Sequence, residues 1–166
     1  MNMIKALRVD ERLIHGQVAV TWCGALSIDR IVVANDKSAN DEVSVMSLQM
    51  AAPQNVKVAV KSVADSVKLL TDPRLSRFNV LVLVNNPFDA LTLVEQVKDI
   101  PYVNVGNFGL LKKDASSEMI STSFAVNAEE KETFKKIAEL KPNSTYQMTP
   151  TLPIVLLKNL LEGKGE

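Results

Sequence analysis

The chain has little of what several protein classes require. Its 166 residues include one cysteine, Cys23, and one histidine, His15. A single cysteine cannot form an internal disulfide, which fits a reducing compartment. One cysteine and one histidine are also too few for a zinc site of the usual kind. We therefore predict a protein with no disulfide framework and no metal site.

An excess of one charge and long apolar runs are absent as well. Lys plus Arg and Asp plus Glu each number 19, so the formal net charge is zero, which argues against a general nucleic-acid binder. No stretch approaches the roughly 20 apolar residues that span a bilayer. The segment from Met1 to Asp10 lacks the long apolar run of a secretory signal. These absences predict a cytoplasmic protein, which can still dock on a membrane protein.

What is present is an alternation of strand and helix patterns. The composition is ordinary, at 46% hydrophobic and 23% charged, and the length suits one domain over 1–166 with a frayed tail at 163–166. Runs that are apolar on both faces indicate strands covered by helices on both sides. The predicted strands are Ile4–Val9, Ile31–Ala34, Val56–Val60, Val80–Val84, Tyr102–Val105, Ile120–Val126 and Thr145–Met148.

Helix-period patterns fall between these strands. In the first, Asp41 is the expected cap, and Met46 and Met50 share a helical face with Val43 and are predicted to lie in the core. The alternation implies an α/β fold with a mostly parallel sheet and right-handed crossovers. The other helical patterns are Val63, Val67 and Leu70; Phe88, Leu91 and Val94 after Pro87; Glu129–Leu140 with Phe134 and Ile137 inward; and Leu152, Leu156 and Leu160 in a closing helix begun near Pro150 and Pro153.

One segment, Arg8 to Val18, carries the best candidates for chemistry. It follows the first predicted strand and leads into a helix expected to start near Gln17. Ligand sites in open parallel sheets lie beyond the carboxyl ends of the strands, where His15 falls. Gly16 lets the backbone approach a ligand closely. The helix start offers unpaired N–H groups and the positive end of its dipole, which suits an anion.

The charged residues of this segment fit a phosphoryl group. The guanidinium groups of Arg8 and Arg12 match phosphate in shape and charge. Asp10, between them, is expected to hold the loop by accepting backbone N–H bonds, or to orient an arginine. Imidazole offers a neutral nucleophilic nitrogen at neutral pH, and phosphoryl transfer needs little beyond positioning and charge stabilisation. A lone loop histidine is usually structural or incidental, and only the combination of these residues favours chemistry.

The same segment closely resembles the active-site motif of the B components (IIB) of the mannose–fructose–sorbose family of the phosphoenolpyruvate-dependent sugar phosphotransferase system. That motif is R-[IV]-D-x-R-L-[IV]-H-G-Q-V, and Arg8 through Val18 matches it at every fixed position. Looser similarity continues at Val32–Asp36, Asn104–Gly106 and Phe124–Val126. The resemblance implies a three-layer α/β/α sandwich with a largely parallel sheet of six to seven strands.

The resemblance also implies a mechanism. His15 would accept a phosphoryl group on Nδ1 from a phosphohistidine of the A component (IIA). It would pass the group to a sugar entering through the membrane components IIC and IID. Arg8, Arg12, Gly16 and Gln17 would bind the phosphoryl group, and Asp10 would hold the loop. The family needs no cofactor beyond the covalent phosphohistidine. The protein would be cytoplasmic and would dock transiently at the inner face of the membrane. The sugar and a homo-oligomeric state are left open.

Loops after three other predicted strands open on the same edge as His15. Their polar or small residues are expected either to contact the site or simply to form turns: Asn35 and Asp36, Asn85 and Asn86, Gly106 and Asn107.

Two other functions compete with phosphoryl transfer. A non-catalytic regulatory module would use the same pocket to bind a phosphorylated ligand without covalent transfer. A hydrolase with His15 as general base is the weaker alternative, because no nucleophile or metal cluster accompanies the histidine.

Overall fold

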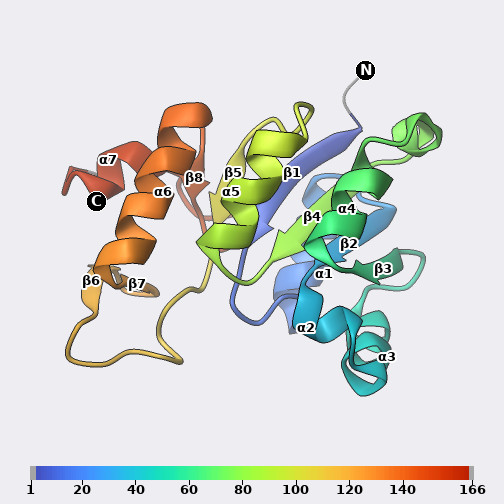
Figure 1. Ribbon diagram of the computed structural model, residues 1–166, viewed down its shortest axis with the longest axis horizontal. Helices are drawn as coiled ribbons and strands as arrows, with labels where there is room; N and C mark the ends of the chain where they lie inside the picture. The colour runs from blue at the N-terminus through green and yellow to red at the C-terminus, as the bar shows by residue number, and fades with distance from the viewer. Residues whose placement is uncertain (1–2, 165–166) are drawn as a thin grey trace.

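A computed structural model describes residues 3–164 of the chain, which form a seven-stranded sheet in the order β3-β2-β4-β1-β5-β8-β9 (Figure 1). Each neighbouring pair from β3 to β8 is parallel, and only β9 runs antiparallel to its neighbour β8. The predicted mostly parallel sheet of six to seven strands is therefore confirmed. The strands of this sheet are β1 Ile4–Val9, β2 Arg30–Ala34, β3 Lys57–Lys61, β4 Val80–Val84, β5 Val103–Val105, β8 Thr145–Tyr146 and β9 Val155–Leu156.

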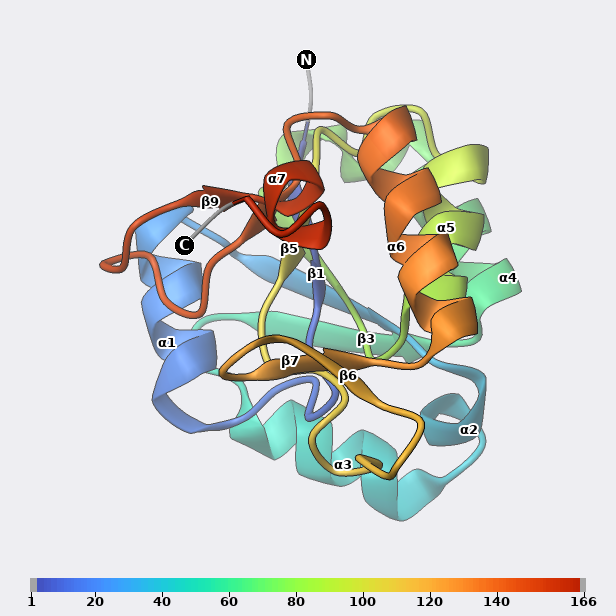
Figure 2. The ribbon, with the colours of Figure 1, turned by 90° about the vertical axis from the view of Figure 1, so that its left-hand side faces the viewer.

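Helices cover both faces of the sheet, as the doubly apolar strands predict. One face carries α1 and α3, and the other carries α4, α5 and α6 (Figures 1 and 2). The helices are α1 Gly16–Ala25, α2 Asp36–Ala39, α3 Glu42–Ala51, α4 Val63–Leu70, α5 Pro87–Gln96, α6 Ala128–Leu140 and α7 Leu157–Leu161, with a 3₁₀ helix at Pro73–Arg77. No helix within residues 3–164 is long and apolar enough to cross a membrane.

The strands divide their side chains between two apolar clusters, because successive side chains of a strand point to opposite faces. Along β4, Val82 belongs to the larger cluster beneath α4, α5 and α6, whereas its neighbours Leu81 and Leu83 belong to the smaller cluster beneath α1. The smaller cluster also contains Leu13 and Ile14, which directly precede His15. Burial of these two side chains fixes the start of the candidate site against the sheet.

The region of 118–126 differs from the prediction of one strand over Ile120–Val126. It forms a hairpin of β6, Glu118–Ser121, and β7, Phe124–Val126, which is separate from the main sheet. The two-residue turn at 122–123 reverses the chain. Phe124 is fully buried and packs edge-on against Phe134 of α6, with ring centroids 4.9 Å apart.

The closing helix also differs from its prediction, since α7 begins at Leu157 rather than near Pro150 and Pro153. Leu152 lies outside it and is 49% exposed. Leu156, predicted to lie in this helix, belongs instead to β9, which pairs with β8. Gly163, expected to lie in a frayed tail, ends α7 at φ 78°, where its N–H and that of Lys164 donate to the last helical carbonyls. The rest of that tail, 165–166, lies outside the described residues.

The prediction that Met46 and Met50 lie in the core is wrong. Both side chains are exposed, at 61% and 82%, as is Val43 at 72%. The helix α3 packs at the edge of the sheet and contacts the smaller cluster through Leu48, so its other side is uncovered. The Asp41 cap is confirmed, because its carboxylate accepts the N–H of Val43.

In α5 the predicted row is buried in part: Val94 is buried and Leu91 is partly buried against the core, whereas Phe88 is 40% exposed. The helix also buries Ala90 and Leu93.

Candidate functional site

The loop between β1 and α1 lies at the carboxyl edge of the parallel strands (Figure 2). A tight turn forms where the N–H of Leu13 donates to the carbonyl of Asp10 at 3.0 Å. Leu13 has φ 58°, a left-handed conformation that costs a side-chain-bearing residue about 1–2 kcal/mol. Burial of the Leu13 and Ile14 side chains offsets that cost, so the turn delivers His15 to the start of α1.

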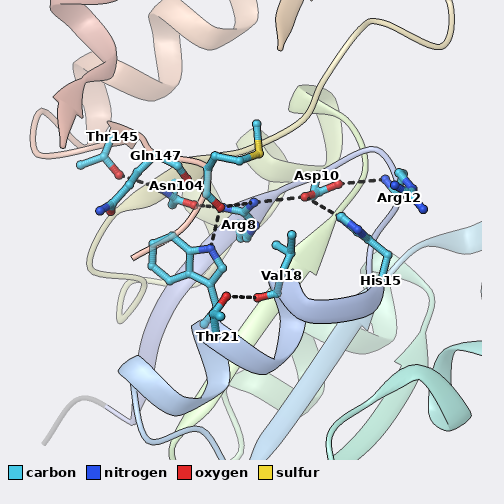
Figure 3. A network of polar contacts seen from close by, with 11 residues as sticks. Arg8, Asp10, Arg12, His15, Val18, Thr21, Asn104, Thr145 and Gln147 are labelled. Atoms are coloured by element: carbon cyan, nitrogen blue, oxygen red, sulfur yellow. Dashed lines mark hydrogen bonds and ion pairs between the residues drawn. The ribbon is translucent and has the colours of Figure 1, made fainter. Parts of the chain in front are cut away.

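Asp10 is the centre of the polar contacts in this loop (Figure 3). Its carboxylate is fully buried and accepts three bonds, each at 3.1 Å, from the Arg8 guanidinium, the Arg12 backbone N–H and Nε2 of His15. A carboxylate with that many donors fixes both the course of the loop and the orientation of the imidazole ring.

Arg8 lies inside the protein, only 2% exposed, on the side of Asp10 away from His15 (Figure 3). Besides Asp10, its guanidinium donates to the Asn104 side chain and to the carbonyls of Gln147, at 3.0 Å, and Met148, at 3.1 Å. Burial lowers the pKa of Arg8, and the Asp10 carboxylate partly offsets this. The family resemblance implies that Arg8 binds phosphate, but in the structure its guanidinium makes its hydrogen bonds to groups within the protein.

Trp22 reinforces this anchor from α1. Its indole N–H donates to the Met148 carbonyl at 2.9 Å, and the Arg8 guanidinium lies 5.2 Å from the centroid of its ring. The contacts of Arg8 and Trp22 thus join β1, α1 and the segment after β8 in one buried group.

His15 is 12% exposed and is the N-cap residue of α1. Its φ of −152° is extended backbone, and its side chain makes no capping bond. The first N–H groups of α1 therefore receive no capping bond from their N-cap side chain, unlike those of α3 and α5, which Asp41 and Asn86 cap.

The residues around His15 leave positive groups accessible. Gly16 and Gln17 are exposed at the start of α1, and Gly16 has φ 47°, which suits glycine. Arg12 is exposed too, and among residues 3–164 its guanidinium has no ion-pair partner. An imidazole, free helix N–H groups and a free guanidinium thus belong to one short segment.

The asparagines of the predicted rim bond to one another and cap helices. Asn35 caps α2 and donates to the Asn85 side chain at 3.1 Å. Asn86 caps α5 and donates to the same Asn85 oxygen at 2.9 Å. The carboxylate of Asp36 accepts the N–H of Val63 at 2.8 Å. The Asn35–Asn85 bond connects the loops after β2 and β4, and the Asp36–Val63 bond connects the loop after β2 to the start of α4. Capping and turn contacts of this kind are the second of the two roles expected for these residues.

Gly106 is needed for the Arg8 anchor. A Cβ added to it would lie 2.1 Å from Nη2 of Arg8, so only glycine leaves room for the guanidinium. The carbonyl of Asn107 accepts the N–H of Glu11 at 2.9 Å, which joins the loop after β5 to the His15 loop.

Sequence reasoning missed two groups that shape the site. The Glu11 carboxylate accepts the N–H groups of Gly109, Leu110 and Leu111 at 3.0, 3.2 and 3.4 Å. Nothing in the sequence signals this contact, since Glu11 occupies the variable position of the motif. Asn104 is the second, and a polar residue within an apolar strand does signal a buried partner.

Metal chemistry has no obvious ligand set here. Within residues 3–164, no group of three or more His, Cys, Asp or Glu side chains is placed to hold a metal ion.

Comparison with known proteins identifies the family. Residues 4–163 match the family described as the sorbose subfamily IIB component of the phosphotransferase system (PTS). The chain is 39% identical over 162 residues to a probable phosphotransferase enzyme IIB component of Streptococcus pyogenes serotype M6, covering 96% of this chain and 99% of that protein. It is 32% identical to the fructose-specific EIIB component of Bacillus subtilis, covering 84% and 83%.

Two further relatives extend the comparison. The mannose-specific EIIAB component of Escherichia coli K12 is 34% identical over 81% of this chain, which corresponds to 41% of that longer protein. The crystal structure of the IIBSor domain of the Klebsiella pneumoniae sorbose permease superposes with a TM-score of 0.88 at 28% identity, covering 96% of each chain. The chain therefore belongs to the sorbose subfamily of IIB components, the phosphocarriers of PTS sugar uptake.

Proposed function

We propose that His15 is the residue that carries the phosphoryl group, and that Nδ1 is the nitrogen that bonds to phosphorus. The observation that carries this proposal is the 3.1 Å contact between Nε2 of His15 and the buried Asp10 carboxylate. An ionised carboxylate only accepts hydrogen bonds, so Nε2 bears the proton and Nδ1 keeps its lone pair.

In the proposed step, the Nδ1 lone pair attacks the phosphorus of a phosphohistidine on the donor. The phosphorus–nitrogen bond of the donor breaks, and its electron pair returns to the donor imidazole. After transfer, Nε2 of the phosphorylated His15 ring keeps its proton and still donates it in a hydrogen bond to Asp10. The negative charge of Asp10 stabilises the ring, which is now more cationic. Every atom needed comes from the two imidazoles and the phosphoryl group.

The charge on the phosphoryl oxygens would be stabilised by groups around His15. The uncapped N–H groups at Gly16 and Gln17 provide donors and the positive end of a helix dipole. Arg12 is exposed and free to pair with the phosphate. Arg8 is a positioning residue in this proposal, because its guanidinium holds Asp10 and the segment at 147–148 rather than facing the surface.

The donor in this proposal is a IIA component, and the acceptor is a sugar presented by the membrane components IIC and IID. The name of the E. coli relative, EIIAB, supports a IIA donor, since it places A and B in one protein. Relatives of comparable identity are named for fructose and mannose, which fits selection of the sugar by the membrane components. The exchange would take place at the cytoplasmic face of the membrane.

Phosphoryl transfer from a ³²P-labelled IIA component tests the proposal. The wild-type chain should acquire a stable label that is lost in acid and retained in base, and His15→Ala should acquire none. Leu140→Gln, a change at an exposed residue of α6, serves as the handling control and should label normally. Reversible binding of phospho-IIA without stable label would instead support the regulatory module, and label on the His15→Ala chain would refute the assignment.

A further inference from the structure

Large apolar side chains are exposed on both sides of the His15 loop. On α3, Val43, Met46 and Met50 are spaced three and four residues apart, so they form one row on the helix surface. They are 72%, 61% and 82% exposed. In the segment after β5, Leu111 is 74% exposed. We call these four residues the apolar rim. A row of exposed apolar side chains such as that on α3 marks an interaction surface more often than an isolated one does.

The two parts of the apolar rim are connected to the His15 loop in different ways, α3 through the smaller apolar cluster and Leu111 through a hydrogen bond. Leu48 brings α3 onto the cluster that contains Leu13 and Ile14, the two residues before His15. The Leu111 N–H donates to the carboxylate of Glu11, the neighbour of Asp10. In Figures 1 and 2, α3 and the segment after β5 lie at the same edge as this loop, and Figure 1 shows one on either side of it. A partner domain that covers this edge of the sheet on both sides of His15 therefore meets the rim.

The burial of His15 requires close approach. Its side chain is only 12% exposed, so a second imidazole can reach it only if the partner presses its surface against this edge of the sheet. An apolar rim around that contact excludes water, which would otherwise compete for the phosphoryl group.

The charge next to the rim favours the donor as the occupant. Arg12 is exposed and, in the described part of the chain, makes no ion pair. Its positive charge complements the negative phosphohistidine of a donor. After transfer the negative phosphoryl group lies on His15 itself, and the attraction that Arg12 exerts on a second protein is reduced.

We propose that the apolar rim is the docking surface for the phosphoryl donor, a protein domain that presents a phosphohistidine. The inference rests on the function proposed above, and it names the surface by which the donor is recognised. Methionine side chains are flexible and polarisable, so Met46 and Met50 can adapt to the donor surface as the two imidazoles come into line.

The test measures the initial rate of label transfer from ³²P-phosphorylated IIA against IIA concentration. The variant Met46→Gln/Met50→Gln keeps side-chain length and helix propensity but removes apolar character. Leu111→Gln probes the other side of the rim. Leu140→Gln and Ile154→Gln are matched controls, since these side chains are 52% and 66% exposed outside the rim. A second assay measures sugar phosphorylation by IIC/IID membranes from each chain after it has been phosphorylated.

We expect the α3 variant to raise the KM for phospho-IIA about tenfold, with the rate at saturating IIA and the thermal midpoint unchanged. Leu111→Gln should raise KM in the same direction, and the controls should not. An unchanged KM in the α3 variant, or an equal rise in the controls, overturns the inference. A loss confined to the membrane assay also overturns it, in favour of the membrane components. Failure of the wild-type chain to accept label would instead refute the proposed function itself.

Discussion

Replacing Gly106 by alanine tests the anchor on which the geometry of the site depends. The new methyl carbon would lie 2.1 Å from Nη2 and 2.5 Å from Cζ of Arg8. Arg8 cannot move aside cheaply, because its guanidinium is buried and makes four hydrogen bonds. Displacing it leaves Asp10 as a buried carboxylate without its cationic partner. We expect His15 to lose its fixed orientation as a result.

The magnitude follows from the cost of breaking a buried ion pair. Removing one partner of such a pair typically costs about 3–5 kcal/mol. With a urea m-value of about 2 kcal/mol/M, a loss of about 3 kcal/mol lowers the unfolding midpoint by about 1.5 M. Since the total free energy of unfolding of a domain of this kind is about 5–15 kcal/mol, the variant should still fold in the absence of denaturant.

The assay combines urea unfolding with the rate of label transfer from phospho-IIA, and Gly24→Ala is the matched control. A Cβ at Gly24 meets nothing within 4 Å, and the residue lies in the exposed part of α1. Alanine there should stabilise the protein by about 0.5–1 kcal/mol. If the free energy of unfolding of Gly106→Ala lies within about 0.5 kcal/mol of the wild-type value, and the variant accepts phosphate at the wild-type rate, the role assigned to Arg8 is refuted.

Three further predictions concern single side chains. Asp10→Asn should lower the free energy of unfolding by about 3 kcal/mol, because it leaves Arg8 unpaired, and it should slow phosphorylation of His15 at least tenfold. A urea midpoint and a rate of label transfer close to those of wild type would contradict this. Ser66→Ala should raise stability by up to about 1 kcal/mol in a thermal melt, because its hydroxyl is buried without a partner among residues 3–164; a loss above 1 kcal/mol would show a missed contact. Burial raises the pKa of Cys23 from 9.0 to about 11, so at pH 8 a disulfide reagent should react about 90-fold more slowly with the folded than with the unfolded chain. Because the unfolded chain releases the thiol proton at lower pH than the folded chain, the Cys23 contribution to the free energy of unfolding falls as pH rises from 9 to 11. Equal reactivity of the folded and unfolded chains with the reagent would refute the raised pKa.

The sheet could be predicted because its signal is local. Each buried parallel strand is a short apolar run, and β1 and β4 were predicted with the bounds that they have in the structure. The position of His15 beyond β1 followed from the same pattern, because chain order and parallel pairing determine which loops share an edge.

Predictions failed where tertiary position overrides local periodicity. The row of Val43, Met46 and Met50 has the spacing of a core face, but α3 lies at the edge of the sheet, where no element of the described chain covers this row. Sequence alone cannot show which helix a sheet leaves uncovered. The start of α7 was missed for a related reason, since β9 forms only by pairing with β8.

The role of Arg8 illustrates the same limit within the site. Its position in the motif implies phosphate binding, but its partners at 104, 147 and 148 lie far away in the sequence. A guanidinium faces inward when distant carbonyls converge on it, and no local pattern reports that convergence. Asp10 and Arg12 differ, because their contacts with the loop are local.

The most direct test of the central claim is to determine which atom bonds to phosphorus. The chain has one histidine, so ring-¹⁵N labelling of His15 gives an unambiguous spectrum after phosphorylation by phospho-IIA. We predict ³¹P coupling to Nδ1, together with a proton on Nε2 bonded to Asp10. Coupling to Nε2, or phosphate on any other residue, would contradict the account.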